Sequence, residues 1–541
     1  MRNTKSLYLW VIVLLGFLFL LNIFSMIQIS ETSDERLHIE YGKRILQCNP
    51  ARWKNDHDSL MPFSCFNVIP WRIGHILENI ITSKKVFDFL YSLNTARYIT
   101  VLFSLVLGLY IFKWSKELYG VIPGLFSLIL YVFSPNIIAH SRLVTTDFYA
   151  ACMTTIALYY FWKFNTHGGW QKATISACTL SMSQLAKYTC VLLYPIIALL
   201  LVTRYAKEIW MLVKTRQGNQ LVRKSMSFGK YVFLFIAIHI IIINIGFCFN
   251  TPFLPFGDYS FKSAFFTFIQ THIPILQYVP VSVPYPYLQG LDWVISTVEN
   301  GFDDIYLLGE WRRIDEDNYA LFKSYFFYTF LFKVPLSIQL FFLFSFIGYI
   351  FNWRKSHFFK DELFLLLPIG FFIIYFSFFF SVQIGIRYFI VFFPLIHVFC
   401  GRLVTGWERW GIKKKGIILG LLFYYIGSVL SYFPYYIPYF NELVWDRKQA
   451  YKFLVDSNIE WSNGYLALEK YKKKYPDTIE NPDKPVAGRI VVNVNALAGL
   501  FDREQYAWLR DNFKPIDHIA YAYLVYEITP EELTKQLKGT F

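Results

Sequence analysis

Charged residues are scarce in this sequence. Aspartate, glutamate, lysine and arginine make up 17% of its 541 residues, whereas 55% are hydrophobic and the mean hydropathy is +0.36. So little charge excludes an ordinary soluble protein, whose surface needs more polar side chains. Internal repeats and low-complexity tracts are also lacking, and no basic stretch resembles a nucleic-acid reader, so we expect no nucleic-acid partner.

Long hydrophobic windows are abundant instead. A helix needs about 20 apolar residues to cross the ~30 Å hydrocarbon core of a bilayer, and we count about eleven such windows. They cover approximately residues 7–27, 98–116, 121–139, 143–164, 173–186, 189–203, 229–250, 326–350, 362–381, 385–403 and 416–436. The fifth and sixth are short and meet at Lys187-Tyr188, which predicts a hairpin. The predicted fold class is therefore a polytopic α-helical membrane protein.

The positions of lysine and arginine predict the orientation. Basic residues are retained on the cytoplasmic side of membrane proteins, and an inside N-terminus places most of them in cytoplasmic connections, including the dense run 204–230. The net charge of +14 then reflects topology and contact with anionic membrane lipids. The first span lacks a small-residue cleavage site, so we expect a retained signal anchor. The expected location is the inner (plasma) membrane, with the C-terminus outside the cytoplasm.

Three segments are predicted on the side away from the cytoplasm, here called the trans side. They are residues 28–97, 251–325 and 437–541. The first has helical stretches suited to the membrane interface, and the proline-rich second is typical of an irregular cover over a cavity. The third changes to a lysine-rich helix over 460–475 and strands over 489–495 and 519–526. We therefore divide the chain into a transmembrane domain, 1–436, and a small extracytoplasmic α/β domain, 437–541.

Cysteine is also sparse. Five of the 7 cysteines fall in hydrophobic windows, where they act as small apolar residues. Cys48 and Cys65 share the first trans segment, where an oxidising compartment allows a disulfide. Two free thiols are the alternative.

Acidic residues occur at informative places. Asp34 and Glu35 follow the first span, where such a pair is often only the polar flank of a helix. Asp147 stands at the trans end of the fourth span, and ionisable groups at membrane depth are costly and usually face a cavity. Together these carboxylates predict a site for chemistry on the trans side.

Three basic residues are expected near the same face. Arg142 lies five residues before Asp147, Lys187 is at the tip of the short hairpin, and Arg387 begins the tenth span. A single basic residue at a helix end commonly extends its charged group to the membrane–water interface. Three together favour a phosphate site, since arginine offers a bidentate fork to phosphate oxygens.

Several strings then occur in an order and spacing that resemble a known family. They are the Asp34-Glu35 pair, RLVTTD from Arg142 to Asp147, LAKYT around Lys187, YLLGE from Tyr306 to Glu310, FLFKVPL with Lys333 and Pro335, GIRY from Gly385 to Tyr388, YFNEL from Tyr439 to Leu443, and LVDSNIEW from Leu454 to Trp461. The chain resembles the polyprenyl-phosphate-sugar-dependent glycosyltransferases of the GT-C fold, the bacterial relatives of protein O-mannosyltransferases and lipid A aminoarabinose transferases. It departs from those relatives at Val444–Arg447 and in DSNIEWSNG.

The resemblance implies a sugar donor on a polyprenyl phosphate and an acceptor on the trans side, which is a protein Ser/Thr, lipid A or another glycan. A carboxylate would draw the proton from the attacking hydroxyl, and cations would stabilise the leaving phosphate. We expect Asp34 to be the general base, with Glu35 and Asp147 orienting acceptor or sugar. The expected substrate-binding residues are Arg142, Lys187, Arg387, Tyr388 and His38.

Other roles stay open. His38 follows Asp34 by one helical turn and is a possible metal ligand with Asp147; some fold relatives bind metal, whereas the protein O-mannosyltransferases do not require it, and we expect no cofactor. Loop anchoring explains the remaining string residues equally well: Glu310, Lys333, Asn441 and Asp456. A transporter of an anionic solute or lipid is the main alternative function, although the inverted halves typical of transporters are missing from the sequence. A scaffold or lipid-flipping protein would need neither Asp34 nor Asp147.

The predicted topology is testable with reporter fusions. Fusions after Lys5 and Gly218 should report the cytoplasm, and a fusion after Tyr475 should report the trans side, because the basic connections remain inside. A cytoplasmic signal at Tyr475 would contradict this orientation.

Overall fold

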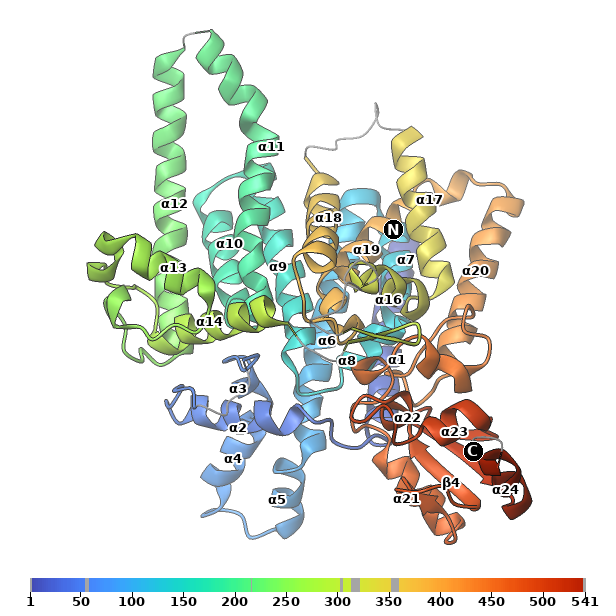
Figure 1. The fold of residues 1–541 in the computed structure, drawn as a ribbon. Helices are drawn as coiled ribbons and strands as arrows, with labels where there is room; N and C mark the ends of the chain where they lie inside the picture. Colours follow the sequence, from blue (N-terminus) through green and yellow to red (C-terminus); the bar gives the residue numbers. More distant parts are fainter. Residues whose placement is uncertain are drawn as a thin grey trace.

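The structure is a computed structural model that describes residues 2–53, 58–215, 217–301, 305–312, 322–351 and 360–538. It is mostly helical and has two small sheets (Figure 1). The predicted fold class, a polytopic α-helical membrane protein with a small C-terminal α/β domain, is confirmed.

The larger part of the molecule consists of long helices that run up and down and of short helical segments that connect or extend them (Figure 1). They are α1 (Arg2–Met26), α6 (Leu93–Tyr119), α7 (Val121–Val132), α8 (Pro135–His140), α9 (Thr146–His167), α10 (Trp170–Ser183), η1 (Tyr188–Leu192), α11 (Leu193–Lys214), α12 (Gly218–Gly246), α16 (Tyr325–Lys333), α17 (Leu336–Phe351), α18 (Leu363–Phe378), η5 (Ile386–Phe392), α19 (Phe393–Cys400), η6 (Gly401–Val404), η7 (Trp407–Arg409) and α20 (Ile412–Leu430). Each predicted window lies mainly on one of these helices or on two or three successive ones.

Five helical segments among the described residues are long and apolar enough to cross a membrane. They are Leu7–Met26, Leu93–Tyr119, Tyr188–Ala206, Gly218–Gly246 and Ile386–Arg409. The pair α16 and α17 passes the same test as one span bent by 110°, and α7 and α18 are shorter apolar helices. Several predicted spans are therefore broken or short rather than single straight rods.

The two large connections lie toward the same end of the molecule as the C-terminal domain, and we keep the name trans end for it (Figure 1). The first holds α2 (Glu35–Leu46), α3 (Ser64–Asn67), α4 (Ile69–Leu77) and α5 (Lys84–Leu90). The second holds η2 (Phe256–Asp258), α13 (Ala264–His272), η3 (Pro274–Tyr278), α14 (Tyr285–Asn300) and the hairpin β1 (Ile305–Leu307) with β2 (Glu310–Arg312). Glu310 is exposed in this hairpin.

The C-terminal domain is built on a four-stranded sheet of order β3-β4-β6-β5. Its strands are β3 (Ile479–Glu480), β4 (Gly488–Asn493), β5 (Asp517–Ile519) and β6 (Tyr523–Ile528). Only the β3–β4 pair is parallel. The helices are α21 (Tyr465–Lys474), α22 (Val494–Ala498), α23 (Ala507–Asn512) and α24 (Pro530–Lys538), and the preceding segment has η8 (Arg447–Lys452) and η9 (Asp456–Asn458).

The segment that leads into this domain packs on the membrane helices. Lys333 is fully buried at the end of α16, and its Nζ donates to the carbonyls of Ile437 at 2.7 Å and Asn458 at 2.5 Å. The Asn441 amide donates to the carbonyls of Leu331 and Val334 at 2.5 and 2.7 Å. Lys333 and Asn441 are thus anchors that attach the tail to α16.

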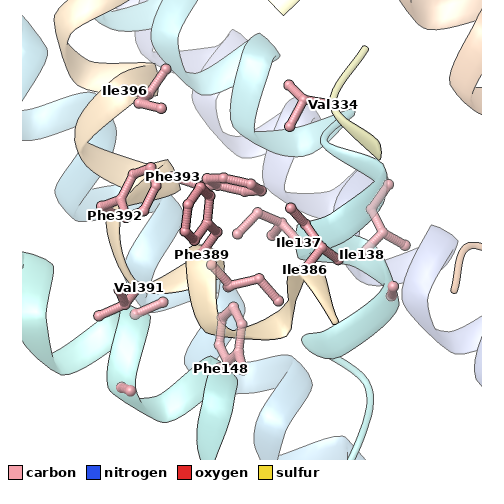
Figure 2. Packing of buried hydrophobic residues seen from close by; sticks show 14 of the residues in the cluster. Ile137, Ile138, Phe148, Val334, Ile386, Phe389, Val391, Phe392, Phe393 and Ile396 are labelled. Atoms are coloured by element: carbon pink, nitrogen blue, oxygen red, sulfur yellow. The ribbon is translucent and has the colours of Figure 1, made fainter. Parts of the chain in front are cut away.

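Aromatic and branched side chains from α8, α9 and η5 pack tightly at the trans end of the core (Figure 2). Ile137 and Ile138 of α8 lie near Ile386 and Phe389, and Phe148 approaches them from α9. Phe148 follows Asp147, and Ile386 precedes Arg387. Close packing leaves these elements little freedom, so the core fixes where both charged residues emerge.

All seven cysteines are free thiols in the structure. Cys48 and Cys65 form no disulfide, and the Cys248 thiol donates to the Ile45 carbonyl at 3.7 Å. The link therefore joins the first trans segment to the end of α12.

A glycine controls how closely α14 approaches the first trans segment. A Cβ at Gly290 would lie 2.5 Å from the Arg52 guanidinium carbon and even closer to the Tyr188 hydroxyl. Gly290→Ala should lower the melting temperature in detergent, because overpacking of this kind costs about 1–3 kcal/mol. Gly370→Ala in α18, where a Cβ meets nothing within 4 Å, is the matched control. Equal stability of the two variants would contradict the tight contact.

Candidate active site

A cavity of about 490 Å³ opens at the trans end between α2, α9, η5 and α14. Six of the residues predicted from the sequence line it: Asp34, His38, Asp147, Lys187, Arg387 and Tyr388. These residues come from four separate parts of the chain. The structure thus brings most of the predicted site together.

One wall carries an ion pair between Asp34 and Arg387. Asp34 precedes α2, and its Oδ2 lies 3.0 Å from a terminal nitrogen of Arg387. The two side chains are 19% and 11% exposed, so the pair is shielded yet reachable from the cavity. The Arg387 guanidinium also stacks on the Trp461 ring at 4.6 Å.

A second ion pair faces the same space. Lys187 donates a hydrogen bond from Nζ to Oδ1 of Asp147, and the same ammonium lies 4.9 Å from the centre of the Tyr388 ring. Asp147 stands in the first turn of α9, where the positive end of the helix dipole stabilises a carboxylate. Two carboxylates and two cations therefore alternate around one cavity.

Residues 457–458 of the C-terminal tail pack behind the segment that carries Arg387. The Ile386 amide donates to Oδ1 of Asn458 at 3.1 Å, and the Ser457 hydroxyl donates to the Ile384 carbonyl at 2.5 Å. A Cβ at Gly385 would collide with that hydroxyl, which explains glycine at this position. The LVDSNIEW string thus supports Arg387. Asp456, which is partly buried, lies in the same turn, and desolvation raises its pKa.

Glu35 points away from the cavity into a buried cluster. Its carboxylate takes two bonds from Arg97, Nε at 2.8 Å and a terminal nitrogen at 2.6 Å. The backbone amides of Thr32 and Val144 also donate to it, at 2.9 and 3.0 Å. Burial by itself would raise the pKa of Glu35, but Arg97 and these bonds outweigh it and lower the pKa. Glu35 therefore joins α2, α6 and the turn before α9, directly beside Asp34.

Arg142 does not line the cavity either. Its side chain is fully buried, donates to the Pro434 carbonyl at 2.9 Å and lies 5.4 Å from the Tyr436 ring. The contacts of Arg142 are thus with the chain that follows α20.

The opposite wall was not predicted from the sequence. Lys262 lies over the Trp293 ring at 3.9 Å, and the carboxylate of Asp292 holds the backbone amides of Lys262 and Ser263 at 2.8 and 2.9 Å. Hydroxyl and amide side chains from α14 continue this wall: Ser296, Thr297 and Asn300. No motif marks these residues, because an irregular loop and a helix end bring them together.

Other supporting residues did leave a signal in the sequence. Arg97 is an isolated cation at the start of a hydrophobic window, as Arg387 is. Trp461 and Asn458 belong to a matching string. Within the described part of the chain, no group of three His, Cys, Asp or Glu residues is placed to hold a metal ion, so the metal role considered for His38 with Asp147 stays a prediction.

The Glu35–Arg97 pair has a measurable consequence. Both side chains are 1% exposed or less, and leaving one member of such a pair without its partner costs about 3–5 kcal/mol. Glu35→Gln should therefore lower the melting temperature markedly. Glu40→Gln, in the exposed pair with Lys43 on the same helix, should have little effect. A small effect at Glu35 would contradict a structural role for this pair.

The same pair predicts a pH dependence. The pKa of Glu35 is lower in the folded protein than its ordinary value, so its stabilisation is complete above the ordinary glutamate pKa of about 4.3 and is lost as the pH falls through the folded value. Acidification from about pH 6 to below pH 4.3 should therefore destabilise the wild type more than Glu35→Gln. Parallel melting curves would give contrary evidence.

Comparison with known proteins adds a family match. Residues 80–221 match the family described as Dolichyl-phosphate-mannose-protein mannosyltransferase. This segment contains Arg97, Asp147 and Lys187, which belong to the buried cluster and to the second ion pair. No curated protein matches the chain.

Two solved structures are similar to this chain in part. ArnT from Cupriavidus metallidurans bound to undecaprenyl phosphate is 13% identical over 79% of this chain and 65% of its own, with a TM-score of 0.46. The archaeal oligosaccharyltransferase AglB from Archaeoglobus fulgidus, in complex with an inhibitory peptide and a dolichol-phosphate, is 13% identical over 78% of this chain and 54% of its own, with a TM-score of 0.42. The chain thus spans between half and two thirds of their lengths. The family match over residues 80–221 confirms the resemblance to the lipid-phosphate-dependent mannosyltransferases that the motifs predicted.

Proposed function

We propose that this protein transfers a sugar from a polyprenyl-phosphate donor to an acceptor hydroxyl on the trans side of the inner (plasma) membrane. The observation that carries the proposal is the set of two carboxylate–cation pairs around one cavity at the trans end. Carboxylates are suited to proton removal and cations to a phosphate leaving group. The family match over residues 80–221 supports the same class of donor.

The donor phosphate binds at Arg387 and Lys187. Both cations face the cavity and are neutralised by carboxylates in the structure, so an arriving phosphate replaces one anionic partner with another. As the bond from the sugar to phosphate breaks, its electron pair passes to the phosphate oxygen, and the two cations stabilise the growing charge.

Asp34 then acts as the general base. Once the phosphate contacts Arg387, the Asp34 carboxylate can accept the proton of the acceptor hydroxyl while that oxygen bonds to the anomeric carbon. Attack opposite the leaving phosphate inverts the anomeric centre. Asp147 orients the acceptor or sugar and holds Lys187, and His38 and Tyr388 complete the wall.

Glu35 and Arg142 have supporting roles in this proposal. Glu35 holds the turn that carries Asp34, and Arg142 holds the segment after α20. The acceptor is a protein Ser/Thr, lipid A or a surface glycan. The transferred sugar is a hexose or a pentose, and the enzyme resembles mannosyltransferases. Membrane lipid surrounds the helices, with the N-terminus inside and the C-terminus outside the cytoplasm.

Asp34→Asn tests the base. The amide keeps the shape of the carboxylate but is not basic, so turnover should fall by roughly 10²–10⁴-fold while donor binding persists. Asp147→Asn should also reduce turnover. Asp88→Asn, at an exposed position of α5, is the matched control. The assay follows transfer from a radiolabelled lipid-linked sugar by reconstituted protein; full activity of Asp34→Asn would remove the base assignment.

Arg387→Ala tests the phosphate site. Loss of its charge should cost about 2–4 kcal/mol of transition-state stabilisation, measured from kcat/KM, and Lys187→Ala should cost less. Arg142→Ala should lower the melting temperature more than Arg387→Ala, because Arg142 makes its contacts inside the protein. Near wild-type transfer by Arg387→Ala would refute the phosphate site.

Uptake of a labelled anionic solute without consumption of any lipid-linked sugar would favour a transporter.

A further inference from the structure

A second cavity, of about 600 Å³, lies where the trans ends of α1 and α6 meet the C-terminal domain. It is not continuous in its lining with the proposed active site, since the two share no lining residue. The walls are joined by hydrogen bonds: the Ser30 amide donates to the Asn463 carbonyl at 3.1 Å, and the Leu466 amide donates to the Ser30 hydroxyl at 2.7 Å. The cavity is therefore part of the docked interface between the two parts of the protein.

Its rim is apolar and lies where two candidate membrane spans end. Ile27 and Leu93 line it, and they mark the ends of two segments long enough to span the membrane, Leu7–Met26 and Leu93–Tyr119. Ile27 is 50% exposed, and Leu466 on the domain side is 40% exposed. An alkyl chain lying in the membrane can thus leave the cavity along the helix ends.

Its interior is polar but offers no spare positive charge. Glu460 lines it and is 92% buried, and Oε1 of this carboxyl has no hydrogen-bond partner in the described part of the chain. Ser462 and Asn493 lie beside it. Arg97 is the one lysine or arginine among the lining residues described, and Glu35 already neutralises it. A phosphate group therefore finds no cation to bind here.

Two tyrosine rings, Tyr465 and Tyr523, complete the lining. Carboxyl, amide and hydroxyl groups next to aromatic rings match a ligand that has many hydroxyls and apolar ring faces. Glu31 and Glu460 are the acidic residues of this lining. Burial raises the pKa of Glu460, and both carboxyl groups can accept hydrogen bonds from hydroxyls.

We propose that this cavity binds the uncharged, hydroxyl-rich headgroup of an amphiphile, with the alkyl chain leaving past Ile27 and Leu93. A membrane glycolipid and the glycan of a lipid-anchored acceptor share this chemistry. The inference stands on the cavity alone and does not depend on the transfer reaction.

Photolabelling of the full-length protein tests the proposal. The protein is purified in an amine-oxide detergent and exposed to three probes that carry the same diazirine-bearing alkyl chain but a maltoside, a trimethylammonium or a phosphate head. Labelled peptides are mapped by mass spectrometry. The maltoside probe should label residues 92–97 or 460–466 about fivefold more than either charged probe, since only its head is complementary to the polar interior.

Variants link the label to the lining. Tyr465→Ala, at a half-exposed side chain, and Glu460→Gln should each lower the maltoside labelling about threefold or more, whereas Trp445→Ala, at a 91% exposed side chain outside the cavity, should not. Unchanged melting temperatures show that the variants are folded. If one of the two lining variants misfolds, the labelling of the other one decides the test.

Three outcomes overturn the proposal. Equal labelling by all three probes identifies a plain apolar groove, preference for trimethylammonium identifies a cation site, and preference for phosphate identifies a lipid-phosphate site.

If the maltoside probe is preferred, competition by excess dodecyl maltoside tests a single-chain glycolipid, and competition by a soluble maltooligosaccharide tests a glycan source. The labelling uses no sugar donor, so its failure and failure of the transfer assay are separate results.

Discussion

The cost of burying charge is the constraint on which the trans end of this protein depends. An unpaired ion away from water is expensive, and a pair is stable only when its geometry and hydrogen bonds are satisfied. Arg97 and Glu35 meet this condition with two short bonds and two backbone amides. Because the amides belong to the α1–α2 connection and to the turn before α9, satisfying the pair also fixes the neighbours of Glu35 and Asp147. Asp34 therefore reaches the cavity from a turn that has little freedom.

The cost of burying charge also explains how the C-terminal tail is attached. Lys333 is buried and forms no ion pair with an acidic residue in the described part of the chain; two backbone carbonyls satisfy its ammonium group instead. Those carbonyls belong to the segment that leads to Trp461, which stacks on Arg387. The C-terminal part is thus a structural element of the proposed site and not an independent appendage. Its docking on the α1–α2 connection also creates the second cavity.

The sequence predicted several residues that line the candidate site, and the residues that it misplaced or missed have two separate causes. Charged residues at the ends of hydrophobic windows are conspicuous, and Asp34, Asp147, Lys187 and Arg387 do meet in the structure. The same reasoning grouped Glu35 and Arg142 with them, but neither side chain lines the cavity. Adjacent residues on a helix point in different directions, so a pair such as Asp34-Glu35 divides between a cavity and a buried partner. The proline-rich segment 251–325 predicted a cover over a cavity, but no motif singled out Lys262 and Trp293, because an irregular loop and a separate helix, α14, bring them together.

Hydrophobic length and the distribution of charge by themselves determined the class of this protein, since both follow from transfer of residues between water and lipid. Strand and helix patterns likewise identified the small α/β unit at the end of the chain. Tertiary structure decided which charges pair, which spans bend and which surfaces enclose a cavity. Those outcomes depend on side chains that are far apart in sequence, such as Asp34 and Arg387, and only close packing in three dimensions brings them within hydrogen-bond distance.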